Sequence, residues 1–199
     1  MFHMKILSTT KLLPALLLAL SVNTLTSSIV SANELDLRIS DDAIHGEFTL
    51  SEHDSKTLFG LGYFYKNDDN AINIINANLH AKGQTAIGNL PATIGLGFQA
   101  NFFKEDEFKG SAVGIGGSLR LNIPSVPGIS FETALHYAPS VLSFGDSDEF
   151  RRFRIQGNYT IIQNADISLG YRYLNVGIED TNNNHTFESG AFLGMKLKF

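Results

Sequence analysis

Apolar residues recur at every second position through most of this chain, and this period limits what the chain can fold into. In ATIGLGFQANFF (residues 92–103), Ile94, Leu96 and Phe98 alternate with glycine and glutamine. A period of two is typical of a β-strand with two different faces. It recurs in residues 112–123, 129–137, 151–161 and 166–174, and no helical period follows residue 32. The sequence therefore predicts an all-β fold.

The N-terminal third brings the expected number of strands to ten. Residues 34–39 and 43–50 are expected to pair about a turn at Asp41–Asp42, and residues 57–66 and 71–81 about a turn at 67–70. Eight strands are left if the first hairpin lies outside the sheet. Because neighbouring segments follow one another along the chain, the expected topology is an antiparallel meander.

The connections between these segments form two alternating sets. KNDDN, KEDEFKG, APSVLSFGDSDEF and GIEDTNNNH are markedly acidic and mostly longer, whereas SEHDS, KGQTAIGNLP, PSVPG and IQNA form the other set. Alternate connections of a meander emerge at opposite ends, so one end is expected to be acidic and rich in loops. Outer-membrane barrels have this asymmetry between short turns and longer external loops.

Residues 1–32 are expected to be a cleaved secretion signal. Lys5 and Lys11 give a positively charged start before the apolar run LLPALLLALSV (residues 12–22), and Val30 and Ala32 give a small-x-small cleavage pattern. The run is about half of the roughly 20 residues that a membrane-spanning helix needs. The mature chain is expected to be one domain, residues 33–199.

Composition excludes several classes of function for that mature chain. Without Lys5 and Lys11, 13 of the 15 basic residues face 20 acidic ones, which gives a net charge of −7. An acidic chain is a poor partner for nucleic acid, which favours a basic face. The chain has no cysteine, which excludes disulfides, thiolate metal sites and a lipid anchor on cysteine.

The polar register indicates which face of the sheet is inside. It is rich in glycine, alanine, serine and asparagine with isolated charges of both signs, which suits a narrow lumen better than a water-exposed surface. We therefore expect a monomeric transmembrane antiparallel meander β-barrel in the outer membrane, with its apolar face toward lipid and its edges closed. Aromatic residues near the acidic loops are expected to form an interfacial girdle: Tyr63, Tyr65, Phe102, Phe103, Tyr137, Phe150, Phe153 and Tyr173.

The last segment is an alternating strand that ends on an aromatic residue. Its apolar register holds Leu193, Met195, Leu197 and Phe199, and Phe192 breaks the alternation. Outer-membrane barrels present such a final strand to the barrel-assembly machinery. These four residues are the expected C-terminal assembly signal.

The C-terminal third resembles the YfaZ family of Gram-negative outer-membrane proteins. The matching pieces are residues 137–139, 142–144, 164–165, 169–172 and 194–195, within residues 137–174 and 193–199. The resemblance implies an outer-membrane barrel. It implies no particular activity and brings no catalytic residues.

Several charged residues of the polar register are expected to meet in the lumen: Arg120, Glu132, His136, Arg152, Arg154, Arg172 and Glu188. The favoured interpretation is a set of ion pairs that fills the interior, because a ten-stranded barrel leaves little free lumen. The alternative is a narrow polar pore lined by arginine. Either reading makes the chain a structural or narrow-channel protein.

A second hypothesis is a hydrolase at the barrel mouth, acting on lipid or peptide. Ser130, Glu132 and His136 share the inner face, and a serine or carboxylate beside a histidine serves hydrolysis. No nucleophile motif supports this, so a hydrogen-bond network in which Glu132 pairs with an arginine across the barrel is preferred. No catalytic residue, cofactor or metal site is predicted.

A third hypothesis is a surface-binding module that uses the acidic loops, at Asp68–Asp69, 105–107, 145–149 and Glu179–Asp180. Carboxylates this dense suit Ca²⁺ or Mg²⁺, but they lack the spacing of a known calcium loop. Solvated loops are the preferred interpretation. Arg151 lies on the apolar register and is expected to reach lipopolysaccharide phosphates. The expected partners are outer-membrane lipid, lipopolysaccharide and the assembly machinery.

Overall fold

The computed structural model describes residues 31–52, 56–67, 70–178 and 184–199, and strands make up almost all of them. The strands are β1 (Ser31–Ile39), β2 (Ala43–Glu52), β3 (Thr57–Asn67), β4 (Ala71–Ile87), β5 (Leu90–Glu105), β6 (Phe108–Asn122), β7 (Ile129–Ala138), β8 (Ser143–Gly145), β9 (Ser147–Ile162), β10 (Ala165–Ile178) and β11 (Asn184–Lys198). A 3₁₀ turn, η3, spans Ser140–Leu142. Within these ranges no helix has the length and hydropathy needed to cross a membrane.

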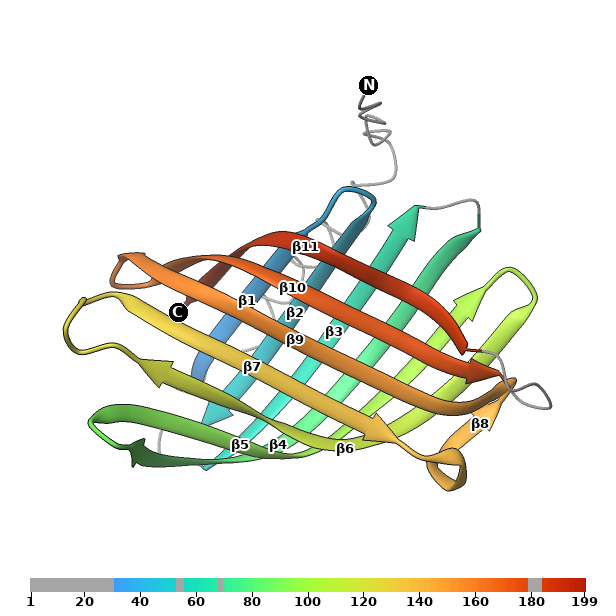
Figure 1. Cartoon of the computed structure of the whole chain (residues 1–199), viewed down its shortest axis with the longest axis horizontal. Coiled ribbons are helices and arrows are strands. Elements are labelled where there is room, and N and C mark those ends of the chain that lie inside the picture. Colours follow the sequence, from blue (N-terminus) through green and yellow to red (C-terminus); the bar gives the residue numbers. More distant parts are fainter. Residues whose placement is uncertain (1–30, 53–55, 68–69, 179–183) are drawn as a thin grey trace.

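Ten of the described strands close into one antiparallel ring (Figure 1). Consecutive strands pair from β1 to β7, β7 pairs with β9, and β10 and β11 follow. The ring closes between β1 and β11, from Glu34 opposite Lys198 to Ile39 opposite Leu193. Closure pairs the strand edges, which lipid requires. The expected ten-stranded meander barrel is confirmed, with the first hairpin inside the sheet.

The expected secretion signal lies almost wholly outside the described residues and stays a prediction. Its boundary after Ala32 falls within β1, where Ala32 pairs with Ser51 of β2. Cleavage at this position would leave β1 to begin at Asn33.

The short strand β8 takes over from β7 as the neighbour of β6 near the acidic-loop end. β7 pairs with Ile115–Asn122 of β6, whereas β8 pairs with Gly110–Ala112 of the same strand. The turn η3 separates β7 from β8, directly after Pro139, which has no backbone N–H to give to a ladder. The expectation that residues 138–150 form one loop was wrong, because η3 and β8 lie within them.

Two connections that were expected to be loops are tight hairpin turns. β4 and β5 continue through most of residues 82–91 and turn at Gly88 and Asn89, where Gly88 has φ +60°. A left-handed residue at this position suits the twist of a two-residue hairpin. β5 and β6 likewise run to within two residues of each other and turn at Asp106, which has φ +50°.

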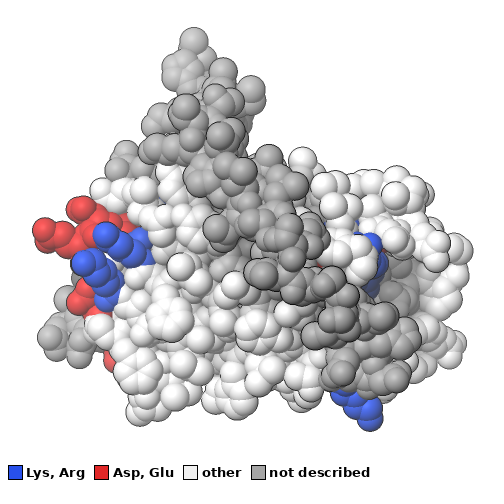
Figure 2. All heavy atoms as spheres, turned by 180° about the vertical axis from the view of Figure 1, so that it is seen from behind, with Lys and Arg blue, Asp and Glu red and all other residues white. Residues whose placement is uncertain are grey.

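The barrel has two ends, the C-terminal end and the acidic-loop end. The C-terminal end holds Lys198 and the turns at 88–89, 123–128 and 163–164. The acidic-loop end holds the turns at 40–42 and 106–107 and the segment 139–146. On the face drawn in Figure 2, charged side chains gather toward the ends and leave uncharged surface between them.

The side chains are distributed inside-out relative to a water-soluble barrel. Leu96, Phe98 and Phe102 of β5 are 54–65 % exposed, whereas Gln99 and Asn101 of the same strand are at most 4 % exposed. Lipid is the solvent that makes such an apolar exterior stable, and the alternation apolar-out and polar-in is the pattern of membrane barrels. The expected orientation of the two registers is confirmed.

Two glycines allow neighbouring strands to approach closely, Gly97 of β5 against β4 and Gly116 of β6 against β7. A Cβ on Gly116 would lie 1.9 Å from the carbonyl oxygen of Leu135, and one on Gly97 would lie 2.0 Å from that of Leu79. Gly97 and Gly116 are register partners. Glycine in a strand typically marks a tight bend at a barrel corner or a close backbone approach.

Candidate functional site

The interior of the barrel is the candidate site, because the predicted charged residues converge there. Glu132, His136, Arg152, Arg172 and Glu188 are all less than 9 % exposed. Arg120 and Arg154 also face the interior and are partly buried. The seven residues belong to β6, β7, β9, β10 and β11, and the closed ring brings them around one axis.

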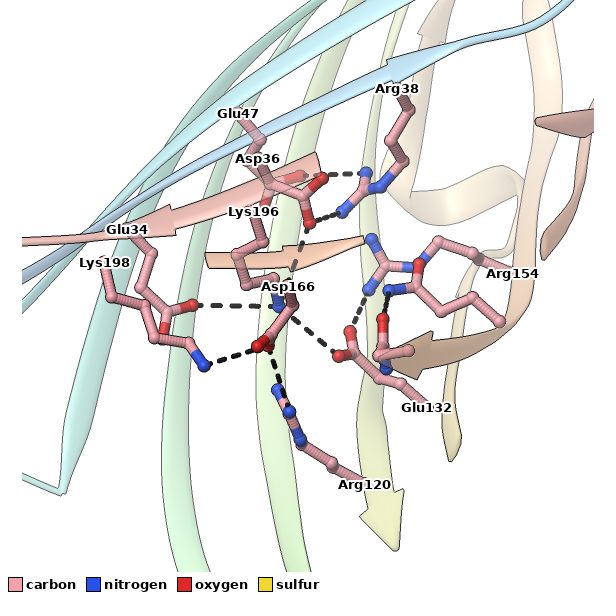
Figure 3. A network of polar contacts seen from close by, with 12 residues as sticks. Glu34, Asp36, Arg38, Glu47, Arg120, Glu132, Arg154, Asp166, Lys196 and Lys198 are labelled. Carbon is pink, nitrogen blue, oxygen red and sulfur yellow. Dashed lines mark hydrogen bonds and ion pairs between the residues drawn. The ribbon is translucent and has the colours of Figure 1, made fainter. Parts of the chain in front are cut away.

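Near the C-terminal end, one carboxylate holds two cations (Figure 3). Asp166 of β10 is 1 % exposed. Its Oδ2 accepts from Arg120 Nη2 at 3.2 Å and from Lys198 Nζ at 2.9 Å, and its Oδ1 accepts from Thr160 Oγ1 at 2.8 Å. β6, β9, β10 and β11 are thereby tied together at this level.

We expect Asp166→Asn to destabilise the barrel. The amide oxygen still accepts, but Arg120 and Lys198 lose their shared counter-charge, so the free energy of unfolding should fall by about 1–3 kcal/mol. Asp42→Asn is the control, because Asp42 is 40 % exposed beside Lys66 and exposed pairs contribute about 0–1 kcal/mol. Urea titration of both variants in detergent measures the difference. Equal losses would contradict the prediction.

Further from the C-terminal end, Glu132 also accepts from two cations. Its Oε1 accepts from Arg154 Nη2, and its Oε2 accepts from Lys196 Nζ at 3.4 Å. Lys196 also lies 3.8 Å from Asp36 Oδ2, and Asp36 pairs with Arg38 (Figure 3). Glu132 was expected to pair with an arginine across the barrel, but Arg154 lies on the neighbouring strand β9.

At mid-height, Arg152 crosses the lumen from β9. Its Nη1 donates to Gln99 Oε1 at 3.3 Å and lies 3.5 Å from Asn101 Oδ1 on β5. Its Nη2 lies 3.3 Å from His45 Nε2 on β2, and His45 Nδ1 lies 2.8 Å from Arg38 Nη1 on β1. Side chains from opposite walls therefore meet at this level.

Arg172 is stacked between aromatic rings. Its guanidinium carbon lies 4.7 Å from the ring centroid of Phe64 and 5.7 Å from that of Phe192. Its Nη2 donates to Glu188 Oε1 at 3.4 Å, and Glu188 also accepts from Ser40. The break in alternation at Phe192 therefore has a cause, since this ring turns inward to cover a buried guanidinium.

The acidic-loop end of the lumen is apolar. The buried residues there, called the apolar plug below, are Ala43, Phe64, Ile72, Ile74, Phe103, Ala112, Ala138, Phe150, Leu174, Val176 and Phe187. The ring of Phe103 lies 5.8 Å from Phe150 and 5.4 Å from Phe187. Phe103 and Phe150 were expected in an outer girdle. That expectation was wrong, because both point inward.

The candidate residues of the hydrolase hypothesis do not contact one another. Ser130 Oγ accepts from Asn158 Nδ2 at 3.4 Å, and His136 Nε2 lies 2.7 Å from His80 Nε2. Glu132 is held by Arg154 and Lys196 instead of by His136. The structure therefore does not bring these three candidate residues together as a nucleophile and its base.

The acidic loops are partly described. Asp68–Asp69 and Glu179–Asp180 lie outside the described residues. Of the others, Asp146 Oδ2 accepts from the backbone N–H of Lys109 and Glu105 pairs with His185. In the described ranges no group of three histidine or acidic side chains could hold a metal ion.

The residues with predicted outward roles face outward. Leu193, Met195 and Phe199 are 42–67 % exposed along the end of the chain, and the Phe199 ring stacks at 6.2 Å on that of Phe48. Arg151 Nη2 lies 2.6 Å from Glu149 Oε1, with its guanidinium over the Tyr137 ring. Recognition of these residues by the assembly machinery and by lipopolysaccharide stays a prediction.

Two features of the interior were missed, the contribution of Asp166 and the contact between His45 and Arg152. Asp166 has the inward parity of Ser168, Gly170 and Arg172, so the alternation of β10 could have found it. His45 has the parity of Glu47, but alternation gives no sign that its ring meets Arg152, 107 residues further along the chain.

Comparison with known proteins gives one family and several barrels. The family model described as "YfaZ precursor" matches residues 10–199. "Outer membrane protein YfaZ" of Escherichia coli (strain K12) is 33 % identical over 116 residues, which cover 57 % of this chain and 61 % of that protein, less than two thirds of its length.

Two solved structures are similar to this chain at low sequence identity. The outer membrane channel DcaP of Acinetobacter baumannii has a TM-score of 0.44 and 10 % identity, over 87 % of this chain and 55 % of that one. The NanC porin has a TM-score of 0.43 and 10 % identity, over 85 % of this chain and 100 % of that one.

Proposed function

The chain belongs to the YfaZ family, and we propose that it is an outer-membrane barrel with a structural role in the membrane and a lumen closed to ions. The proposal rests on what fills the lumen at two successive levels. One level is apolar and the other is a lattice of charged and amide side chains.

The apolar plug is the observation that carries the proposal. Phe103, Phe150 and Phe187 are at most 3 % exposed, and the ring of Phe103 contacts the rings of both Phe150 and Phe187 across the end of the lumen. Phe108, at the start of β6, stacks on Phe103 at 5.9 Å and covers the apolar plug at the acidic-loop end. An apolar constriction of this kind excludes water and hence hydrated ions.

The polar level below the apolar plug supports the same conclusion. Arg152 reaches from β9 to side chains on β5 and β2, so it bridges the lumen instead of lining a path through it. Glu132 and Asp166 each hold two cations nearer the C-terminal end. Small barrels are commonly filled by their own side chains in this way.

The test is conductance of the refolded barrel in a planar bilayer of defined lipid. We expect no stable opening at moderate voltage, with insertion verified by protease protection and with a conducting porin as the positive control. A steady conductance step for each inserted barrel would overturn the proposal. Such steps would favour the alternative of a narrow arginine-lined pore.

A further inference from the structure

Two lysines lie directly opposite each other on the outer face of the barrel, near the acidic-loop end. Lys104 of β5 and Lys109 of β6, called the lysine pair below, are register partners with exposed side chains. Lys104 has the outward parity of Phe102, so its partner faces outward too. Directly opposite side chains have Cβ atoms about 4.5–5.5 Å apart, and like charges placed so destabilise a sheet. A negative charge between the two ammonium groups would relieve this repulsion.

The described part of the protein does not supply that negative charge. No carboxylate oxygen of the described residues lies within 4.0 Å of either ammonium nitrogen of the lysine pair. Glu105, next to Lys104, pairs with His185. Asp146 accepts from the backbone N–H of Lys109 at 2.8 Å. The other two acidic residues of this hairpin form its turn, further from the membrane.

Arg151, the residue expected to reach lipopolysaccharide phosphates, differs from the lysine pair in this respect. It also faces outward near this end, but its Nη2 lies 2.6 Å from Glu149 Oε1. A cation that already has a counter-ion must give up that pair to bind another anion. The lysine pair is therefore better placed than Arg151 to bind an anion from outside the protein.

A row of exposed apolar side chains lies next to the lysine pair, one outward position nearer the middle of the barrel. It holds Ile75 of β4, Phe102 of β5 and Phe144 of β8, which are 52–57 % exposed and connected through Ser111 of β6 in the strand register. Aromatic side chains gather where the hydrocarbon of a membrane meets its headgroups. The lysine pair therefore lies at the level of the headgroup phosphates.

We propose that the lysine pair binds a phosphate group of lipopolysaccharide, whose acyl chains lie over Ile75, Phe102 and Phe144. Two ammonium groups can donate to different oxygens of one phosphate, and such charge-assisted bonds are strong. Longer loops mark the acidic-loop end as the external one, where lipopolysaccharide forms the outer leaflet. The apolar row favours a lipid over a free phosphate ion. The site lies on the outer face of the wall, so it does not depend on whether the lumen conducts.

The first test is the urea-unfolding midpoint of the refolded full barrel in an uncharged detergent that contains lipid A, the membrane anchor of lipopolysaccharide. Lipid A with both phosphates is compared with the same lipid A after both phosphates have been removed. We expect the phosphorylated form to give the higher midpoint, and saturation to about 100 times Kd increases the folded-to-unfolded ratio about 100-fold. Equal midpoints with the two forms would overturn the proposal.

Two further probes separate the possible sources of the phosphate. Inorganic phosphate lacks acyl chains, and phosphatidylglycerol carries a single phosphodiester on a different headgroup. At equal phosphate concentration, each should raise the midpoint less than phosphorylated lipid A does. An equal rise with either probe would overturn the assignment to lipopolysaccharide.

Variants locate the effect. The double variant Lys104→Gln, Lys109→Gln should abolish the difference between the two forms of lipid A, whereas Lys104→Arg, Lys109→Arg, which keeps both charges, should retain it. Lys56→Gln is the matched control, because Lys56 is an exposed lysine just before β3 at the opposite end of the barrel. It should keep the full difference. A full difference in the double glutamine variant would overturn the proposal.

The same double glutamine variant gives a separate result without lipid A. Its urea midpoint should then equal or exceed that of the wild type, because the change removes the repulsion between opposite lysines. A lower midpoint would mean that the lysine pair has a stabilising partner within the protein, which would overturn the proposal.

Discussion

Phe150→Ala should be among the most damaging side-chain truncations in this barrel. Phe150 is 0 % exposed in the apolar plug and lies 5.8 Å from Phe103, ring centroid to ring centroid. Truncation removes a ring that its neighbours cannot replace, and buried Phe→Ala changes cost about 3–5 kcal/mol. Urea unfolding of the refolded variant in detergent measures the loss.

Phe144→Ala is the matched control for this prediction. Phe144 lies in β8 at the same end of the barrel but is 54 % exposed, and substitutions at exposed positions usually change stability by roughly 0.5 kcal/mol. Similar losses in Phe144→Ala and Phe150→Ala would contradict an interior position for Phe150. The planar-bilayer experiment on Phe150→Ala then reports whether the apolar plug also blocks ions.

The fold could be predicted because the exterior and the interior of a membrane barrel impose a period of two on every strand. In β5, Ile94, Leu96 and Phe98 have one parity, and Gln99 and Asn101 the other, so the faces were assigned correctly. The expectation of ten strands followed from counting such segments.

The apolar plug could not be predicted from the alternation of apolar and polar residues, because that alternation fails near the acidic-loop end. Ile74 and Ile75 are adjacent, as are Phe102 and Phe103, so both registers are apolar near the acidic-loop end. In the structure Ile75 and Phe102 face outward, while Ile74 and Phe103 are buried. The available signal was that Phe103 continues the parity of Gln99 and Asn101.

The ion-pair partners within the lumen could not be predicted from the sequence either. Arg120 lies opposite Glu132 in the β6–β7 register, so these two were natural partners. Instead Arg120 donates to Asp166, and Glu132 accepts from Arg154 and Lys196. Long side chains in a narrow lumen can reach several strands, and the curvature of the wall decides which acceptor is nearest.

That curvature depends on glycine, and Gly116→Ala should prevent the barrel from closing. The new Cβ would lie 1.9 Å from the carbonyl oxygen of Leu135 and 2.7 Å from the Cα of His136. These are backbone atoms of the neighbouring strand β7, so no side chain can rotate away. We expect a loss of more than about 3 kcal/mol, beyond the roughly 1–3 kcal/mol typical of an overpacked core.

Gly83→Ala separates this effect from a general intolerance of glycine replacement. Gly83 lies in β4, and a Cβ there would meet no atom within 4 Å, so the variant should fold as wild type or slightly better, since alanine restricts the unfolded chain. The measurement is the fraction of refolded protein that keeps the faster gel mobility of an unheated barrel. Normal folding of Gly116→Ala would mean that β6 and β7 do not approach as closely as described. Gly97→Ala should fail to fold as well, because a Cβ there would lie 2.0 Å from the carbonyl oxygen of Leu79 on the neighbouring strand β4.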